Sequence, residues 1–287
     1  MKIDLRDVTL CAVDCVTPEL AVRAIEKSLT GCRFGRVLLL TDCLAAPSMS
    51  HERVQIEPLR SIHDYSRFML KGLGAHIHTE FVLIIQWDGF VVDPTSWTDG
   101  FRQFDYIGAR WDWYSDPYKV GNGGFSWRSR RLLQATAAPT FEVHPDLAED
   151  LQICRLRRDQ LTASHGIRFA DDQTAGRFSY ERSIPDQPTF GFHGLFNLWR
   201  HASDAEIHWM MERMQPHAFK SREFIELMLT YWLQRRFPMV RSLLGRALSI
   251  RSAESVAQHI DQLTRKPEIA RALLSLDQGL EAPVDST

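Results

Sequence analysis

The sequence predicts an α/β fold with a mixed, mainly parallel sheet flanked by helices, followed by a helical C-terminal region. Apolar runs of strand length alternate with helical patterns over residues 1–200. The run at 81–85, Phe-Val-Leu-Ile-Ile, has no polar side-chain atom, which predicts a strand buried on both faces. Strand patterns vanish after about Trp199, so we expect a sheet domain over 1–200 and a helical region over 201–287.

Local patterns define the elements of the sheet domain. Thr17, Pro18 and Glu19 provide an N-cap, a proline at the first helical position and an early acid, so a helix begins there. A second helix is expected over 64–74, where apolar residues recur at helical spacing. Strands are expected at 8–13, 36–40, 54–56 and 81–85. The resulting β-α-β-β-α-β order implies parallel strands with helices on the faces of the sheet.

The remainder of the chain has less regular patterns. The elements expected next are a strand over 106–109, a helix over 126–137, a helix that Asp146 or Glu149 opens and that ends near Gly166, and a short strand over 167–169. Beyond the domain boundary we expect helices at 205–214, 221–235 and 252–263, and frayed residues from about Glu281.

Composition excludes several classes of protein. Of the 287 residues, 34 are Lys or Arg and 36 are Asp or Glu, a net charge of −2 that carries no signal for nucleic-acid binding. The five cysteines form no C-x-x-C pair, which argues against a disulfide framework and a zinc ribbon. The sequence has no apolar run of about 18 residues that would span a membrane, and its first residues lack the apolar core of a signal peptide. We therefore expect a cytoplasmic protein.

Four segments carry polar residues in positions that suit chemistry. In the first, Gln86, Asp88 and Gly89 follow the buried strand at 81–85. Because ligands bind at the carboxyl ends of strands in open α/β sheets, Asp88 can hold a metal or a phosphate, and Gly89 allows close backbone approach. Taken alone, such an aspartate is more often a turn former or a helix cap.

The second segment is a glycine loop that comprises Asn122, Gly123 and Gly124. Its glycines let the backbone approach a ligand, and the helix expected after it offers N–H groups. The third is the acid pair Glu149 and Asp150 at a helix start, which favours an ionised carboxylate and so suits a general base. Tight connections and helix caps are the ordinary explanations of these two patterns.

The fourth segment places His193 between two glycines in the apolar stretch 190–194. A single histidine of this kind is more often a packed or hydrogen-bonded residue than a metal ligand. All four segments together, in this order, are harder to explain as unrelated structural features.

The run from Val8 to Phe196 resembles the glycosyltransferase-like domains of the GT-A type. The motifs that carry the resemblance are Q-x-D-G at 86–89, Y-I-G-A at 106–109, V-G-N-G-G-F-S at 120–126 with Arg128 and Arg130 after it, E-D-x-x-I-C at 149–154 and F-G-F-H-G at 190–194. The combination is specific, although no single motif is. The resemblance implies an inverting, hexosyltransferase-like enzyme that transfers a sugar from a nucleotide-sugar donor to a hydroxyl acceptor, in the biosynthesis of a glycan such as a surface polysaccharide.

The resemblance also implies a divalent cation. Gln86 and Asp88 stand where these enzymes keep a D-x-D motif, and His193 matches the distal histidine that completes metal or diphosphate binding. Asp88 and His193 together suit Mn²⁺ better than Mg²⁺, because imidazole is the softer ligand. Gln86 supplies an amide in place of the first acid and adds no negative charge beside the cation.

Further roles are implied for residues at matching positions. Asp150, with Glu149 as the second candidate, matches the catalytic base of inverting members, and the glycine loop matches the segment that lines the donor sugar or the acceptor. Val13, Asp14 and Asp42 end the first two strands, where they can contact the nucleotide. Asp42 is preferred, because a carboxylate can accept two ribose or imino hydrogen bonds.

Two regions outside these motifs could contact an acceptor. Trp113 and Tyr114 can stack on an acceptor sugar or pack in the core, whereas core packing is favoured for Trp111. The stretch 219–251 combines seven basic residues and two acids with aromatic side chains, so it can lie on the inner face of an anionic membrane beside a lipid-linked acceptor. A packed helical lid or dimer surface is the favoured alternative for this stretch.

The sequence keeps one other functional class open and argues against a second. A catalytically inactive GT-A domain could bind a glycan or a partner protein, since the first acid of the D-x-D motif is missing. A nucleotidyltransferase would need two acids near the strand at 81–85 and a basic glycine loop near the N-terminus, and the sequence has neither.

Overall fold

The computed structural model describes residues 2–43 and 50–277, which form two compact units. One unit spans Met1–His193 and the other spans Gly194–Thr287. We call them the sheet unit and the helical unit. The fraying expected from about Glu281 falls outside the described residues.

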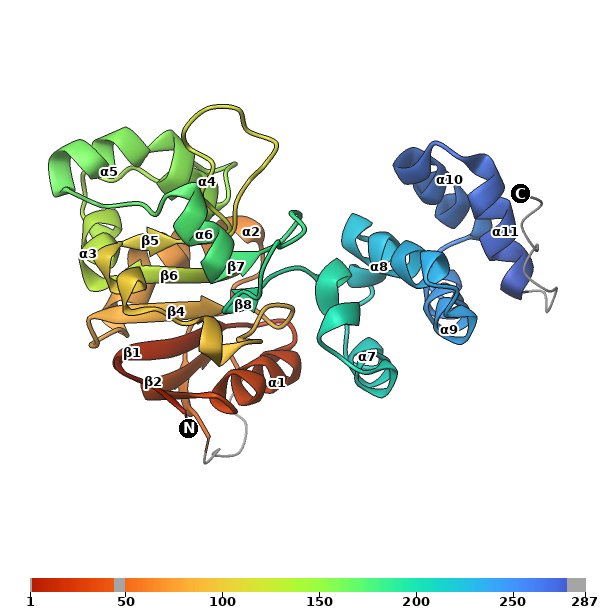
Figure 1. Ribbon diagram of the computed structural model, residues 1–287, viewed down its shortest axis with the longest axis horizontal. Coiled ribbons are helices and arrows are strands. Elements are labelled where there is room, and N and C mark those ends of the chain that lie inside the picture. The colour runs from red at the N-terminus through yellow and green to blue at the C-terminus, as the bar shows by residue number, and fades with distance from the viewer. Residues whose placement is uncertain (1, 44–49, 278–287) are drawn as a thin grey trace. The chain divides into compact units, whose positions relative to one another are not determined.

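A six-stranded sheet with the order β3-β2-β1-β4-β6-β5 forms the centre of the sheet unit (Figure 1). Its strands are β1 (Ile3–Val13), β2 (Cys32–Thr41), β3 (Glu52–Gln55), β4 (Phe81–Ile85), β5 (Tyr106–Ile107) and β6 (Phe125–Ser129). The first four run parallel, and β6 runs antiparallel to both of its neighbours. The predicted fold class, a mixed and mainly parallel sheet flanked by helices, is confirmed.

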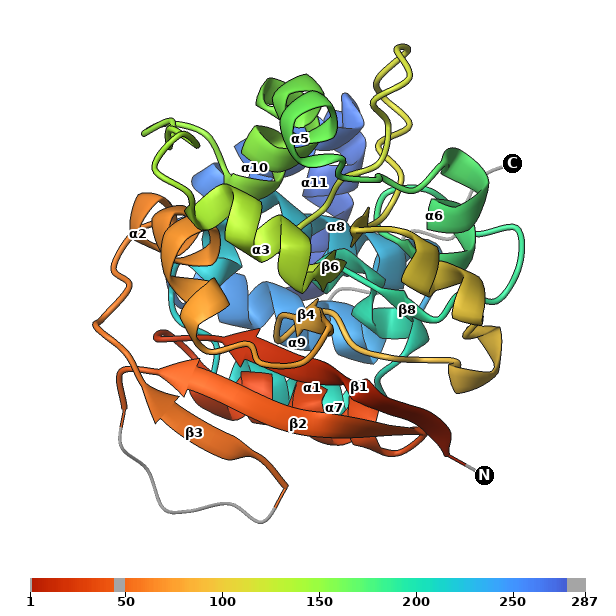
Figure 2. The ribbon, with the colours of Figure 1, turned by 90° about the vertical axis from the view of Figure 1, so that its left-hand side faces the viewer.

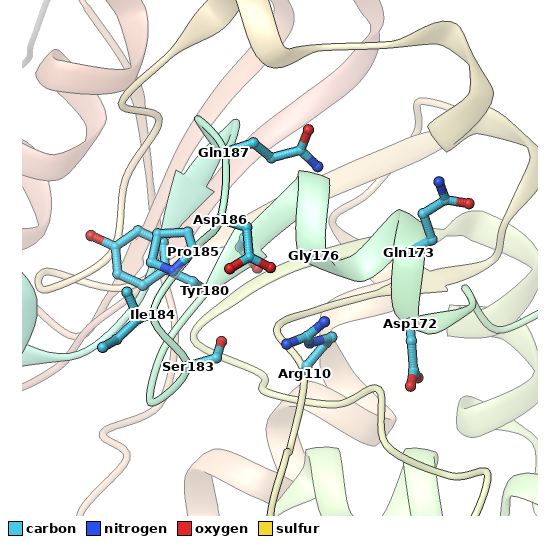
Figure 3. Close-up of a pocket in the computed structure, with 11 residues that line it drawn as sticks. Arg110, Asp172, Gln173, Gly176, Tyr180, Ser183, Ile184, Pro185, Asp186 and Gln187 are labelled. Atoms are coloured by element: carbon cyan, nitrogen blue, oxygen red, sulfur yellow. The ribbon is translucent and has the colours of Figure 1, made fainter.

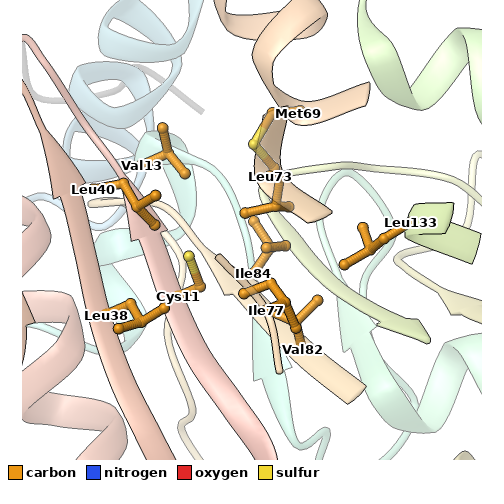
Figure 4. Packing of buried hydrophobic residues seen from close by; sticks show 10 residues of the cluster. All are labelled: Cys11, Val13, Leu38, Leu40, Met69, Leu73, Ile77, Val82, Ile84 and Leu133. Atoms are coloured by element: carbon orange, nitrogen blue, oxygen red, sulfur yellow. The ribbon is translucent and has the colours of Figure 1, made fainter. Parts of the chain in front are cut away.

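Helices cover both faces of this sheet (Figure 2). Helix α1 (Pro18–Leu29) lies on one face. The other face carries α2 (Ile62–Arg67), which continues as a π-helical turn and a 3₁₀ turn to Ala75, and α3 (Arg130–Ala137). Figure 4 shows how the second face packs: apolar residues of alternate positions on β1, β2 and β4 meet residues from the helical layer, among them Met69, Leu73 and Leu133.

The strand β6 corrects the predicted helix over 126–137. The structure forms a strand through Ser129, and the helix α3 begins only at Arg130, with the Ser129 hydroxyl accepting from the Leu132 N–H at 3.1 Å. All five residues of β6 are buried, because the strand lies between β4 and β5. The buried polar residues Ser126 and Arg128 hide the apolar pattern from which a strand is recognised.

The second half of the sheet unit supplies the remaining elements around the glycine loop. Helix α4 (Glu149–Leu151) passes through a π-helical turn into α5 (Arg158–His165), which ends at Gly166 with a φ of 61°. Helix α6 (Asp172–Phe178) leads into β7 (Ser179–Tyr180), which pairs in parallel with β8 (Gly191–Phe192). The strand expected over 167–169 is reduced to a single bridge between Phe169 and Tyr106.

The helical unit contains two 3₁₀ helices, of which the second is Ala218–Lys220, and five α-helices among its described residues. The others are the 3₁₀ helix Leu195–Arg200, α7 (Asp204–Met211), α8 (Arg222–Leu233), α9 (Phe237–Leu248), α10 (Ala253–Thr264) and α11 (Pro267–Asp277). Helices α7, α8 and α10 correspond to the expected ones, whereas α9 and α11 were not predicted. None of the described helices is long and apolar enough to cross a bilayer.

The apolar side chains of the basic stretch 219–251 are mostly used inside the helical unit. Phe224, Leu227, Tyr231 and Met239 are buried there. This burial supports the packed-helix interpretation of the stretch, since these side chains are not available to insert into a membrane surface.

Candidate active site

Three polar side chains converge after the carboxyl end of β4. The His193 Nε2 atom lies 3.0 Å from Gln86 Oε1 and 3.4 Å from Asp88 Oδ1. The Gln86 amide nitrogen donates to the Tyr65 hydroxyl at 3.0 Å, which directs its oxygen towards His193. A Cβ on Gly89 would lie 2.8 Å from the Phe192 carbonyl oxygen, so the backbone approach requires glycine there.

Glu181 and Asn122 hold the other edge of the same imidazole. His193 Nδ1 lies 3.3 Å from Glu181 Oε1 and 3.1 Å from Asn122 Nδ2. Burial alone would lower the pKa of His193, but the carboxylates of Asp88 and Glu181 outweigh it and raise that pKa to about 10. The backbone N–H of His193 donates to the backbone carbonyl of Tyr180 at 2.9 Å, and this pairing brings Glu181 into the site.

The glycine loop joins this group to the acid pair. Asn122 has a φ of 67°, and the next residue, Gly123, donates its N–H to Asp150 Oδ2 at 3.0 Å. A Cβ on Gly123 would lie 2.1 Å from Glu149 Oε1, and one on Gly124 would lie 2.1 Å from His193 Nε2. Both glycines are therefore required by the close approach of functional side chains rather than by a turn.

Asp150 is the half-buried carboxylate on the far side of the loop. Its second oxygen, Oδ1, accepts the Leu151 N–H at 2.7 Å. Burial and the neighbouring Glu149 raise the pKa of Asp150 to about 7, against the two N–H groups and Arg128, which favour the charged form. The helix start was expected to keep this carboxylate ionised, but α4 has only three residues and burial prevails.

Glu149 is committed to a buried ion pair. It is 4% exposed, and its Oε1 accepts from Arg128 Nη2 at 2.8 Å. Arg128 is 0% exposed and also donates from Nε to the Ser126 hydroxyl at 3.0 Å. A charge buried in this way is costly unless it is paired, so Glu149 compensates Arg128 and is not free to accept a substrate proton.

The residues expected to contact the nucleotide lie at the ends of β1 and β2. Val13 is the last residue of β1, and Asp14 accepts the Val16 and Thr17 N–H groups at 2.7 and 2.6 Å. Burial raises the pKa of Asp14, and the charge on Asp88 adds to the shift, so Asp14 lies within the field of the β4 group. Asp42 lines an open hollow of about 700 Å³ together with residues that include Ile56 and Phe68.

An aromatic segment that contains Trp111, Trp113 and Tyr114 adjoins the glycine loop. Trp111 is 4% exposed and belongs to the hydrophobic core, which confirms the packing expected for it, and its ring occupies the space beside Gly121. Trp113 is 54% exposed, with its ring centroid 6.0 Å from that of Trp111 and 5.9 Å from that of Tyr114. Arg155 lies 3.6 Å above the Tyr114 ring. Trp113 thus presents an aromatic surface to solvent on a packed support.

The β4 group has the ligand types of a divalent-cation site. Among the described residues, no three His, Cys, Asp or Glu side chains are arranged to hold a metal ion. The set here instead combines the Asp88 carboxylate, the Gln86 amide oxygen and the His193 imidazole, ligand types that Mn²⁺ accepts once the cation has displaced the proton that the raised pKa of His193 keeps on the ring. Glu181 on Nδ1 matches the carboxylate that commonly orients a metal-bound histidine.

The sequence did not predict that Glu181 contacts His193 or that Arg128 forms an ion pair with Glu149. Glu181 has no local signal, because only the pairing of β7 with β8 brings it to His193. Arg128 was noted as part of a basic helix, whereas it is a buried strand residue. Its proximity to Glu149 depends on tertiary structure alone.

Several solved glycosyltransferase structures are similar to this chain at low scores. A glycosyltransferase involved in glycosylation of the major capsid of PBCV-1 is 13% identical over 72% of this chain and 99% of its own, with a TM-score of 0.42. The galactosyltransferase LgtC, in complex with donor and acceptor sugar analogues, is 16% identical over 67% of this chain and 86% of its own, with a TM-score of 0.39. The mannosyltransferase PcManGT from Pyrobaculum calidifontis, in complex with GDP-Man and Mn²⁺, is 10% identical over 96% of this chain and 76% of its own, with a TM-score of 0.40.

Comparison with sequences gives a family. No curated protein matches the chain. A family model described as protein of unknown function, DUF5672, matches residues 48–193, a segment that holds the glycine loop, the acid pair and His193. That segment is just over half of the chain, and the chain therefore belongs to the DUF5672 family.

Proposed function

We propose that this chain is an inverting glycosyltransferase that transfers a sugar from a nucleotide-sugar donor to a hydroxyl group of an acceptor. One observation carries the proposal: consecutive residues of the glycine loop, Asn122 and Gly123, contact His193 on one side and Asp150 on the other. The side chains suited to binding a cation and a diphosphate, and the carboxylate suited to proton transfer, therefore contact the same loop. The motif resemblance to GT-A domains supports the same reaction.

The β4 group would hold the donor diphosphate through a divalent cation. Asp88, Gln86 and His193 are the residues that would bind it, with Glu181 orienting the imidazole. Such an ion supplies positive charge to the leaving diphosphate. Asp14 and Asp42 follow the neighbouring parallel strands, where the nucleoside would lie, and the hollow at Asp42 has room for a base.

Asp150 would act as the general base. A base works best when its pKa lies near the working pH, and burial together with Glu149 brings the pKa of Asp150 into that range. The carboxylate takes the proton of the acceptor hydroxyl as that oxygen attacks the anomeric carbon. Attack from the face opposite the leaving diphosphate inverts the configuration. Glu149 and Arg128 act as positioning residues, because their ion pair fixes the chain beside Asp150.

The acceptor would be a glycan or a lipid-linked sugar, as in the biosynthesis of a surface polysaccharide. Trp113 offers an exposed ring for stacking, with Tyr114 against it. Work at the inner face of a membrane would require only peripheral contact, for which the basic side chains of 219–251 remain the candidate surface.

Thermal shift with nucleotide sugars tests the proposal. UDP-, GDP-, CMP- and dTDP-sugars are each added with and without Mn²⁺, and one donor class should raise the melting temperature. The same donor should then be hydrolysed slowly to a sugar whose first-formed anomer, followed by NMR, has the inverted configuration. Retention of configuration would refute the inverting mechanism, and no response to any donor would refute the transferase.

A binding module is the second candidate, favoured by one observation. Gln86 replaces the first acid of the D-x-D motif, so the cation group has less negative charge than is usual for a metal-dependent transferase. The two candidates separate on turnover, because a binding module would be stabilised by a glycan and would hydrolyse no donor.

A further inference from the structure

A polar cavity of about 160 Å³ lies beside the candidate active site. Its walls come from Arg110, from α6 and from the segment that follows β7. Figure 3 shows the Arg110 guanidinium, the Ser183 hydroxyl and the Asp186 carboxylate facing a common space, with Tyr180 and Pro185 at one side. None of the roles described above uses these side chains.

The chemistry of the walls suits a neutral polyhydroxyl ligand. The polar groups that line the cavity are both donors and acceptors: Arg110, Asp172, Gln173, Ser183, Asp186 and Gln187. Two carboxylates oppose one guanidinium, and Arg110 is already paired with Asp112 at 3.2 Å, so the cavity lacks the excess positive charge that a phosphate requires. Planar amides and carboxylates instead match the paired hydroxyl groups of a sugar ring.

A buried hydroxyl at the wall points to the same conclusion. Ser179 is 1% exposed, and among the described residues its Oγ has no hydrogen-bond partner. Buried polar groups in folded proteins are nearly always satisfied, so an unpaired hydroxyl beside a cavity requires an explanation, and a bound ligand or water is one partner that would satisfy it. The apolar surfaces of Tyr180 and Ile184 complete a wall on which the carbon face of a sugar can rest.

The backbone connects this cavity directly to the reaction centre. Ser179 and Tyr180 line the cavity, and the next residue, Glu181, contacts His193. On the opposite wall, Arg110 pairs with Val120, which precedes the glycine loop by two residues. Because successive residues are only about 3.8 Å apart, a ligand in the cavity would lie within reach of the loop.

We propose that this cavity binds the acceptor saccharide, and this inference rests on the proposed glycosyltransferase function. Arg110, Ser183 and Asp186 would recognise hydroxyl groups of an uncharged sugar unit, and the hydroxyl to be glycosylated would extend past Glu181 towards Asp150. Trp113, which follows Arg110 closely in the sequence, would contact the next sugar unit of the glycan.

Saturation-transfer NMR on the full-length protein without a donor tests this inference. The probes are the methyl glycosides of glucose, galactose, mannose and N-acetylglucosamine, with inorganic phosphate as the negative probe. Two variants alter the cavity from different elements. The Asp186→Ala/Gln187→Ala double variant removes two polar side chains at exposed loop positions, and Gly176→Met places a side chain in the cavity beside Arg110. Glu80→Gln, an exposed acid just before β4, is the matched control.

We expect at least one glycoside to bind the wild type and the control, and its dissociation constant to rise at least tenfold in both cavity variants. Equal binding in all four proteins, or no glycoside binding, would overturn the inference. Donor hydrolysis by the wild type reports the glycosyltransferase function separately. Hydrolysis without glycoside binding would remove the cavity proposal alone, and glycoside binding without hydrolysis would remove its role as an acceptor site.

Discussion

The sheet unit and the helical unit bury different kinds of side chain. Among the described residues, every buried charged side chain belongs to the sheet unit, and Asn197 is the one buried polar residue of the helical unit. The interior of the helical unit is otherwise apolar, as at Leu243 and Leu244 on α9. Because a buried charge costs free energy unless it is paired, each charged side chain buried in the sheet unit needs either a compensating partner or a functional reason.

Two aspartates of the sheet unit refine this comparison. Asp105 is buried, and burial alone would raise its pKa, but Arg131 and Ser129 outweigh that effect and lower it. The pKa of Asp150 is raised instead by its burial and by Glu149, and the donors that contact it among the described residues are two backbone N–H groups. A carboxylate that serves structure is thus matched with cations, and the proposed base is not.

The largest expected effect is on turnover. Asp150→Asn keeps the shape of the side chain but cannot accept a proton, so we expect kcat to fall by a factor of about 10² to 10⁴. Donor affinity should stay within about twofold, since the diphosphate is held elsewhere. Steady-state kinetics and thermal shift with the identified donor measure both quantities. Unchanged turnover would move the base to another residue.

The buried ion pair should give the largest stability effect. Arg128→Met leaves Glu149 buried without its partner, and we expect the free energy of unfolding to fall by about 3–5 kcal/mol. The double variant Arg128→Met/Glu149→Gln removes both charges and should recover part of that loss. Chemical denaturation followed by fluorescence provides the measurement, and equal losses in the single and double variants would show that the pair is not coupled.

A cavity in the helical unit should destabilise through packing alone. Leu244→Ala removes a fully buried side chain from α9 and should cost about 2–5 kcal/mol. The loss should depend little on pH, because Leu244 carries no charge and no charged residue of the helical unit is buried as a whole among the described residues. Denaturation at two pH values checks this, and a loss that changes with pH would break the contrast between the units.

The smallest expected effect lies on the surface of the helical unit. Arg222 pairs with Glu226 at 2.7 Å along α8, and the Arg222 side chain is 61% exposed. Replacing Arg222 with Ala should change the free energy of unfolding by only about 0.3–0.5 kcal/mol, and less at high salt. A larger change in the same denaturation assay would mean that this surface contributes more than solvent-exposed pairs normally do.

Much of the fold could be predicted because local patterns determine it. The apolar run of β4 and the Pro18 start of α1 are visible in the sequence and recur in the structure. Strand β6 could not be predicted, because its buried polar residues Ser126 and Arg128 break the apolar pattern and their burial depends on β4 and β5. Helices α9 and α11 were missed although Pro238 and Pro267 mark their starts in the same way as Pro18 marks that of α1.

The candidate site was predictable as a set of residues but not as a set of contacts. Asp88, Asn122, Asp150 and His193 stand out by type and by neighbouring glycines. In the structure Asp88 contacts His193, His193 contacts Asn122, and the next residue of the loop, Gly123, contacts Asp150. The partner Glu181 and the direction of the pKa shift of Asp150 depend on burial and on residues distant in sequence. No local pattern carries that information.

Stability as a function of pH tests the electrostatic contrast most directly, and it needs no substrate. A raised pKa in the folded state favours folding with Asp150 protonated, and this contribution is lost as pH rises from about 4 to about 7. Asp150→Asn should therefore gain stability relative to the wild type across that range, whereas Asp105→Asn, which removes a carboxylate of lowered pKa, should lose it as pH rises from acid to neutral. Opposite trends for the two variants are the predicted result, and parallel trends would contradict the assignment of Asp150 as the base.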